Sequence, residues 1–228
     1  MFYPRWFLAM AMLVVISTTF AAPPSSAQGV DLLKQALETE KAGNKTAALG
    51  LYTSAIQAGD LTRAQLALAY YRKGGIRGAL GDNSLGIEDF SRSIEHNPAY
   101  GEALSLRGYL RGVIGQYDLA ERDHHAAIKL ADQAKWPNYL PWTLQHMADV
   151  LRRRGDFGKA LEYCDRALQN SSYAPVLLRR AWINMDKGDT ARAKIDFAAF
   201  QRAAEEQKIP FDIFWPDERE AFNRLSRL

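Results

Sequence analysis

Cysteine is almost absent from this sequence, and neither sign of charge dominates it. Cys164 is the single cysteine among 228 residues, so no disulfide can form within the chain. The hydrophobic core must then stabilise the fold alone, and Cys164 is predicted to be a small buried apolar residue of that core. The alternative, an intermolecular disulfide or a redox-active thiol, requires an exposed side chain. The formal net charge of +3 is too small to indicate nucleic acid as a partner.

Residue patterns typical of enzymes are also missing. The sequence contains no nucleophile–base pair, no carboxylate pair and no metal-ligand spacing. Gly74, Gly75 and Gly78 lie inside a helix-like segment and follow no strand, so they do not form a phosphate-binding loop. We therefore expect no enzyme, with no catalytic residues, no cofactor and no metal. Catalysis would instead require convergent side chains with perturbed pKa values.

Long apolar runs are absent except at the N-terminus. Arg5 precedes an almost wholly apolar stretch, Trp6 to Phe20, and small residues follow it. This order is typical of a secretory signal peptide, so residues 1–27 are predicted to be removed by cleavage before Gln28. The stretch is shorter than the roughly 20 residues that span a bilayer, and a retained inner-membrane anchor is the alternative. The protein is expected to be exported, and to be periplasmic if its source is Gram-negative.

The sequence does contain a repeat of about 34 residues, marked by glycine. Successive marker glycines are 38, 34, 40 and 33 residues apart, and each lies between two helix-like segments. A chain that leaves a helix there needs a residue that tolerates positive φ. Small residues stand seven positions before each marker, and mostly bulky residues stand nine positions after it. The markers are Gly43, Gly81, Gly115, Gly155 and Gly188; the small residues are Ala36, Gly74, Gly108, Ala148 and Ala181; the later residues are Tyr52, Phe90, His124, Cys164 and Phe197.

This pattern resembles the tetratricopeptide repeat (TPR), in which small residues let two helices approach and bulky residues fill the gaps between them. The best match runs from Tyr70 to Pro98, and the resemblance covers about residues 29–207. It implies an all-α fold, a right-handed α-solenoid of about five helix-turn-helix units with a C-terminal capping helix. The array is predicted over residues 28–207, with units at about 29–62, 63–100, 101–138, 139–173 and 174–207, and the cap over 208–228.

Two inserted segments lengthen the spacing between marker glycines. Gly59 is expected to end one helix, and Asp60 to be the N-cap of the next. The second insertion, from Lys135 to Trp142, has two prolines and three aromatic residues. It is interpreted as a loop that folds onto the neighbouring unit, or as a lip that contacts a ligand.

The adjacent His124 and His125 raise the question of a metal site or a catalytic base. His124 occupies the column that the other repeats fill with Tyr, Phe or Cys, which predicts a buried filler between two helices. Successive residues on a helix are about 100° apart, so the two rings diverge. A helix that chelates a metal uses i, i+3 or i, i+4 spacing instead. We interpret both histidines as parts of the scaffold.

Charged residues vary together between the repeats. A basic residue eight positions before the marker glycine occurs only where an aspartate stands eight positions after it. This covariation predicts ion pairs between the paired helices or between neighbouring units. Such pairs fix register more than they add stability. The predicted pairs are Lys73–Asp89, Arg107–Asp123 and Arg180–Asp196.

The resemblance also implies a function. In such arrays the first helices of successive units line a concave groove that holds a peptide or a partner helix. We therefore expect a non-catalytic scaffold or adaptor of the cell envelope, with a protein or peptide as partner. A self-associating structural component of the envelope is the alternative. The residues expected to face the groove are Leu37, Tyr71, Tyr109, Asp149, Arg152, Arg153 and Trp182.

Overall fold

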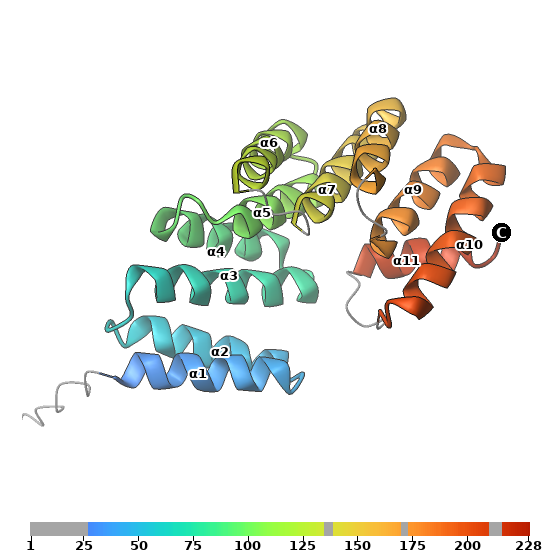
Figure 1. The fold of residues 1–228 in the computed structure, drawn as a ribbon. Helices are drawn as coiled ribbons and strands as arrows, with labels where there is room; N and C mark the ends of the chain where they lie inside the picture. Colours follow the sequence, from blue (N-terminus) through green and yellow to red (C-terminus); the bar gives the residue numbers. More distant parts are fainter. Residues whose placement is uncertain (1–26, 135–138, 170–172, 210–215) are drawn as a thin grey trace, which may run out of the picture.

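A computed structural model of the protein describes residues 27–134, 139–169, 173–209 and 216–228. These residues form helices and no strand, and the helices follow one another along a curved array (Figure 1). The predicted signal peptide lies outside the described residues, apart from Ala27. The helices are α1 (Gln28–Lys41), α2 (Lys45–Gln57), α3 (Arg63–Leu80), α4 (Asn83–His96), α5 (Gly101–Val113), α6 (Tyr117–Ala134), α7 (Tyr139–Arg154), α8 (Phe157–Leu168), α9 (Ala174–Lys187), α10 (Thr190–Glu206) and α11 (Pro216–Leu225).

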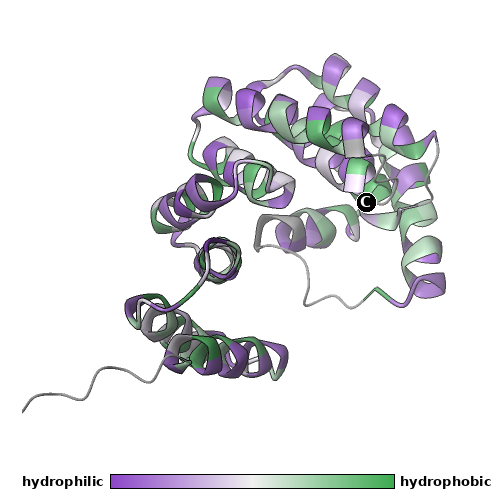
Figure 2. Cartoon of the chain, turned by 60° about the vertical axis from the view of Figure 1, so that its left-hand side comes forward, coloured by the Kyte–Doolittle hydropathy of each residue, from purple (hydrophilic) through white to green (hydrophobic). Residues whose placement is uncertain are grey.

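The first ten helices form five antiparallel pairs, from α1–α2 to α9–α10, which we number as the first to the fifth unit. Each pair packs on the next, and α11 packs on α9 and α10. Along each helix hydrophobic residues alternate with hydrophilic ones (Figure 2), as expected for helices that bury one face. The predicted solenoid of five helix pairs with a C-terminal capping helix is confirmed. Among the described helices, none is both long and apolar enough to cross a membrane.

The turn inside each unit forms where the sequence predicts it. All five marker glycines have φ between 80° and 91°, the left-handed region in which a Cβ is unfavourable. The residue after the marker often caps the second helix. The side chains of Asn44, Asp156 and Asp189 each accept a hydrogen bond from the backbone N–H three residues later. Glycine followed by a capping residue is thus the local signal that ends one helix and begins its partner.

The predicted start of α3 is wrong by two residues. Thr62 is the N-cap, because its side chain accepts from the N–H of Gln65 while the Gln65 side chain accepts from the N–H of Thr62. Asp60 instead accepts hydrogen bonds of 3.0 and 3.1 Å from the N–H of Gly29, at the start of α1. Its carboxylate therefore ties the loop before the second unit back to the first. Gly59 has φ of 78° and follows the C-cap of α2, as expected of a glycine at this point.

The interior of the units confirms the columns of small and bulky residues. Phe90 and His124 are both fully buried, each against the glycine of its own unit. A Cβ at Gly74 would lie 3.1 Å from the Phe90 ring, and one at Gly108 would lie 2.8 Å from Nε2 of His124. His124 therefore fills the space that phenylalanine fills in the second unit, and its predicted scaffold role is confirmed.

Cys164 occupies the same column in the fourth unit. Its side chain is fully buried, and burial raises the pKa of its thiol to about 12. A thiol without solvent access and without an accessible thiolate is unreactive. The prediction of a small buried apolar residue is confirmed.

All three predicted ion pairs are present between the two helices of a unit. Lys73 Nζ lies 2.9 Å from Asp89, and Arg107 and Arg180 each reach 2.7 Å from their aspartates, Asp123 and Asp196. Each aspartate also has a second donor one turn further along the first helix, which the sequence reasoning missed. These donors are Arg77, Arg111 and Asn184.

Two of the basic residues also reach the preceding unit. Arg107 donates to the Ser91 hydroxyl at 3.1 Å, and Arg180 donates to Asp165 at 2.7 Å. The first alternative of the prediction therefore holds for all three pairs, and the neighbouring unit is reached through other partners of the same guanidinium groups. These contacts fix both the pairing and the stacking of the helices.

We expect Arg107→Met to lower the free energy of unfolding by about 1–2 kcal/mol, because it removes the main partner of a buried carboxylate. The triple change Arg107→Met, Arg111→Leu and Asp123→Tyr should cost less, although it alters more residues. It copies the fourth unit, where Met147, Leu151 and Tyr163 replace the charged residues. Urea denaturation followed by circular dichroism measures both. A larger loss in the triple variant would contradict the pairing argument.

Candidate functional site on the concave face

The concave face is formed by the first helices of the units. α5 packs against α7 and α7 against α9, whereas α3 and α5 approach each other at few positions. These contacts place the first helices on the inner side of the curve, with α6 and α8 on the outer side (Figure 1). The inner face is therefore closely packed in its C-terminal half and more open in its N-terminal half.

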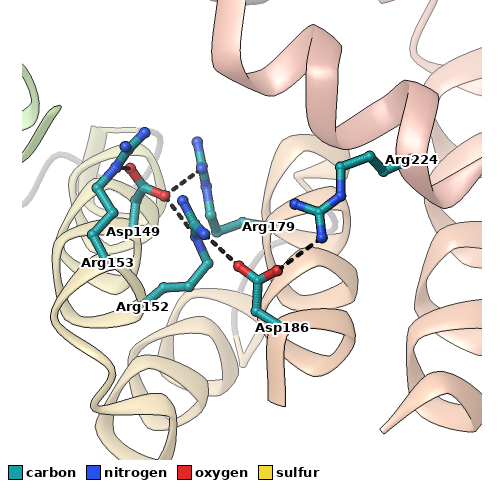
Figure 3. Close-up of polar contacts among 6 residues, drawn as sticks. All are labelled: Asp149, Arg152, Arg153, Arg179, Asp186 and Arg224. Carbon is teal, nitrogen blue, oxygen red and sulfur yellow. Dashed lines mark hydrogen bonds and ion pairs between the residues drawn. The ribbon is translucent and has the colours of Figure 1, made fainter. Parts of the chain in front are cut away.

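A buried carboxylate organises the closed half. Asp149 on α7 has an exposed fraction of 0%, and three arginines donate to it. Arg179 of α9 lies at 2.6 Å, and Arg152 and Arg153 of α7 lie at 3.0 and 2.7 Å (Figure 3). Burial alone would raise the pKa of this carboxyl, but the three guanidinium groups outweigh it and hold the pKa well below its usual value. Asp149 is therefore ionised at neutral and mildly acidic pH.

A second carboxylate extends this arrangement to the end of the array. Asp186 on α9 accepts from Arg152 of α7 and, at 3.4 Å, from Arg224 of α11 (Figure 3). The Arg152 guanidinium also stacks 3.7 Å above the centre of the Trp182 ring. We call these side chains the Asp149 cluster: Asp149, Arg152, Arg153, Arg179, Asp186 and Arg224. The cluster joins α7, α9 and α11 into one block.

Three residues predicted to face the groove are buried instead. Tyr109, Asp149 and Trp182 have exposed fractions of 1%, 0% and 5%, so they offer a partner almost no surface. The physical reason is the close packing of α5, α7 and α9, which covers positions that would be open in a wider curve. Tyr109, for example, packs against the ring of His146 at 5.0 Å.

The other four predicted residues retain some access to solvent. Leu37 and Tyr71 on the first and second units are half-buried. Arg152 and Arg153 have side-chain exposed fractions of 9% and 18%, and their donors are directed at Asp149. The structure thus brings Asp149, Arg152, Arg153 and Trp182 together in the closed half, while Leu37 and Tyr71 lie apart in the open half.

Aromatic side chains gather where the open half meets the closed half. Tyr71 of α3 lies 4.8 Å from Tyr100, the residue before α5, and Tyr139 lies 5.4 Å from Trp142 on α7. The Tyr139 ring packs on Gly101, where a Cβ would lie 3.2 Å from it, so the two pairs are neighbours. We call Tyr71, Tyr100, Tyr139 and Trp142 the aromatic cluster. All four are half-buried, and burial raises the pKa of Tyr100 to about 12.

Sequence reasoning found only Tyr71 of this cluster. Tyr139 and Trp142 belong to the aromatic insertion from Lys135 to Trp142, which the sequence analysis interpreted as a loop or as a lip that contacts a ligand. Residues 135–138 of that insertion lie outside the described residues, but Tyr139 is the first residue of α7 and so belongs to a helix. Half-exposed aromatic rings offer flat apolar surface with polar edges, which suits contact with another protein. Among the described residues, no group of His, Cys, Asp and Glu has the arrangement of a metal site.

No protein-family profile matches the chain, and no curated protein matches it. Solved structures do. TTC0263, a thermophilic TPR protein of Thermus thermophilus, is 16% identical and superposes over 88% of this chain and 100% of its own, with a TM-score of 0.66. The chain has the tetratricopeptide-repeat fold.

Two further neighbours in fold are PilW and PilF. PilW, described as a widely conserved type IV pilus biogenesis factor, is 17% identical over 87% of this chain and 84% of its own, with a TM-score of 0.65. PilF of Pseudomonas aeruginosa is 13% identical over 87% and 88%, with a TM-score of 0.60. At these identities the likeness concerns the fold alone.

Proposed function

We propose that this TPR protein is a non-catalytic scaffold of the cell envelope that binds a peptide or a partner protein on its concave face. The observation that carries the proposal is the aromatic cluster where the open half of that face meets the closed half, and where Tyr71 and Trp142 keep solvent-accessible surface. Aromatic residues are enriched among those that dominate binding energy at interfaces. The envelope location is supported by the apolar N-terminal stretch and by the pilus role in the description of PilW.

In this proposal the seven predicted groove residues have three different roles. Leu37 and Tyr71 contact the partner directly. Arg152 and Arg153 border the site from the closed half, and the buried Tyr109, Asp149 and Trp182 shape it from beneath. The partner lies along α1, α3 and the start of α5, because the packing of α7 and α9 excludes it from the C-terminal half.

A photo-crosslinking amino acid placed at position 37 tests the proposal in cell-envelope extracts. Position 195 is the control, because Ile195 on the outer helix α10 has an exposed fraction of 69%. We expect a partner that crosslinks at position 37 and not at position 195. In a binding assay with the purified partner, Tyr71→Ala should weaken the affinity at least tenfold, which corresponds to about 1.4 kcal/mol or more. Tyr117→Ala on α6 should leave it unchanged, and equal effects of the two changes would contradict the assignment.

Self-association is the second candidate, and one observation favours it. Leu80, Leu85, Ile114 and Leu119 flank the turns of the second and third units, with exposed fractions between 39% and 51%. Exposed apolar side chains of this kind are surface that copies of a protein can bury against each other. Light scattering over a hundredfold range of protein concentration separates the two candidate functions. A constant monomer mass would exclude self-association and would leave the partner-binding scaffold.

A further inference from the structure

Two buried histidines face each other at the junction of the third and fourth units. His124 on α6 and His146 on α7 have exposed fractions of 0% and 2%. Their rings are parallel within 4°, with centroids 6.3 Å apart. The Trp142 ring contacts the His146 ring edge-on, with centroids 4.7 Å apart. The Tyr109 ring of α5 contacts the His146 ring in the same way, with centroids 5.0 Å apart. The pair therefore lies inside the closed half of the array, at the interface between α6 and α7.

Neither ring is satisfied by hydrogen bonds. Both nitrogens of both imidazoles are buried and have no hydrogen-bond partner among the described residues. A neutral imidazole has one N–H donor and one acceptor, and leaving them buried without partners costs stability. Other repeats include apolar residues at the same two positions: Phe90 and Phe197 match His124, and Leu106 matches His146. Phenylalanine and leucine at these two positions pack without this cost, while the remaining repeats have a basic residue where His146 stands: Lys34, Arg72 and Arg179.

The surroundings keep both rings neutral while the array is closed. Burial lowers the pKa of His124 to about 3, and the neighbouring His125 on α6 adds to this effect. Burial also lowers the pKa of His146 well below its usual value, helped by His124 and by Arg179 of α9. Asp149 on α7 attracts a proton to both rings but is outweighed. Tyr109 faces the pair from α5.

From this geometry we infer that the His124–His146 pair is an acid-operated joint, which opens the packing of α5 and α6 against α7 in mildly acidic solution. In the opened state each imidazole reaches water and binds a proton with its ordinary pKa near 6.5. The opened state therefore binds more protons than the closed one, and the closed state loses stability as the pH falls below about 6.5. This continues toward pH 3, where His124 becomes protonated even when closed.

The histidine pair and Asp149 affect stability in different pH ranges. Asp149 has a lowered pKa, so its contribution to stability is present above about pH 4 and is lost only at lower pH. Between pH 7.5 and pH 5.0 the pair alone should raise the opening equilibrium constant about 30-fold per histidine, and on the order of a thousandfold for both. Opening would separate Tyr71 and Tyr100 from Tyr139 and Trp142, the two sides of the aromatic cluster.

Hydrogen exchange of the full chain, followed by mass spectrometry at pH 7.5 and pH 5.0, tests the inference after correction for intrinsic exchange rates. In the wild type, peptides from α5 and α7 should show an opening constant that rises on the order of a thousandfold at pH 5.0. In the double variant His124→Phe and His146→Leu, which takes both residues from other repeats, the rise should be less than fivefold. Peptides from α1 and α2 should change little in either protein.

His125→Gln is the matched control, because His125 is exposed on the same helix, and it should behave as the wild type. If the double variant does not fold, the single change His124→Phe, with a rise of about 30-fold, decides the question. The inference is overturned if the variants keep the full pH dependence of the wild type. It is also overturned if α1 and α2 open together with α5 and α7, since the whole array then unfolds and no joint exists.

Discussion

Asp149→Ala is expected to lower the free energy of unfolding by about 3–5 kcal/mol, because it removes the buried carboxylate to which three arginines donate. Arg179 is the most affected, since its side chain has an exposed fraction of 2% and donates to Asp149 at 2.6 Å. The loss should be concentrated in the C-terminal half, where α7, α9 and α11 meet. Urea denaturation measures its size, and hydrogen exchange shows its location.

Asp165→Ala is the matched control for this change. Asp165 also accepts from an arginine, Arg180, but its side chain has an exposed fraction of 60%. Exposed ion pairs contribute about 0–1 kcal/mol, so this variant should lie within about 0.5 kcal/mol of the wild type. If Asp149→Ala were equally mild, the Asp149 cluster would not hold the closed half together.

Glycine-to-alanine changes should have opposite signs at two helix-interior positions. Gly108→Ala is expected to cost about 1–3 kcal/mol, because the new Cβ would lie 2.8 Å from Nε2 of the buried His124 and 3.1 Å from the backbone oxygen of Ala120. Gly75→Ala should instead stabilise the fold by up to about 1 kcal/mol. No atom lies within 4 Å of a Cβ at Gly75, and alanine reduces the freedom of the unfolded chain.

Thermal unfolding at one protein concentration compares the two variants directly. A change of 1 kcal/mol moves the melting temperature by about 2–4 °C in a chain of this length. Gly108→Ala should therefore melt several degrees below the wild type, and Gly75→Ala a few degrees above it. A gain of stability at Gly108 would mean that the third unit has room between its helices, contrary to the packing described above.

The sequence predicted the structure well wherever one position could be compared across five repeats. Phe90, His124 and Cys164 differ in chemistry, but their shared place in the register made burial between two helices the simplest interpretation, and the structure confirms it. The pairing of Arg107 with Asp123 was predicted in the same way, because basic residue and aspartate appear or disappear together. Periodicity provides such comparisons without any structure.

Features that belong to a single unit could not be predicted in this way. Asp149 has no counterpart of like charge in the other repeats, so nothing in the register revealed that it would bind arginines from two helices. The burial of Tyr109 and Trp182 depends on how closely successive first helices pack. The repeat pattern determines which face of a helix points inward, but the distance to the next unit depends on the side chains that meet there.

The inert thiol of Cys164 has a practical consequence for experiments on the array. Because this cysteine is the only one in the chain and is fully buried, maleimide reagents should leave the native protein unlabelled. Any pair of cysteines introduced on the surface would then carry spin labels or fluorophores at known places. A pair spanning α3 and α8 would report the distance across the junction directly, at any pH and without removal of a native residue.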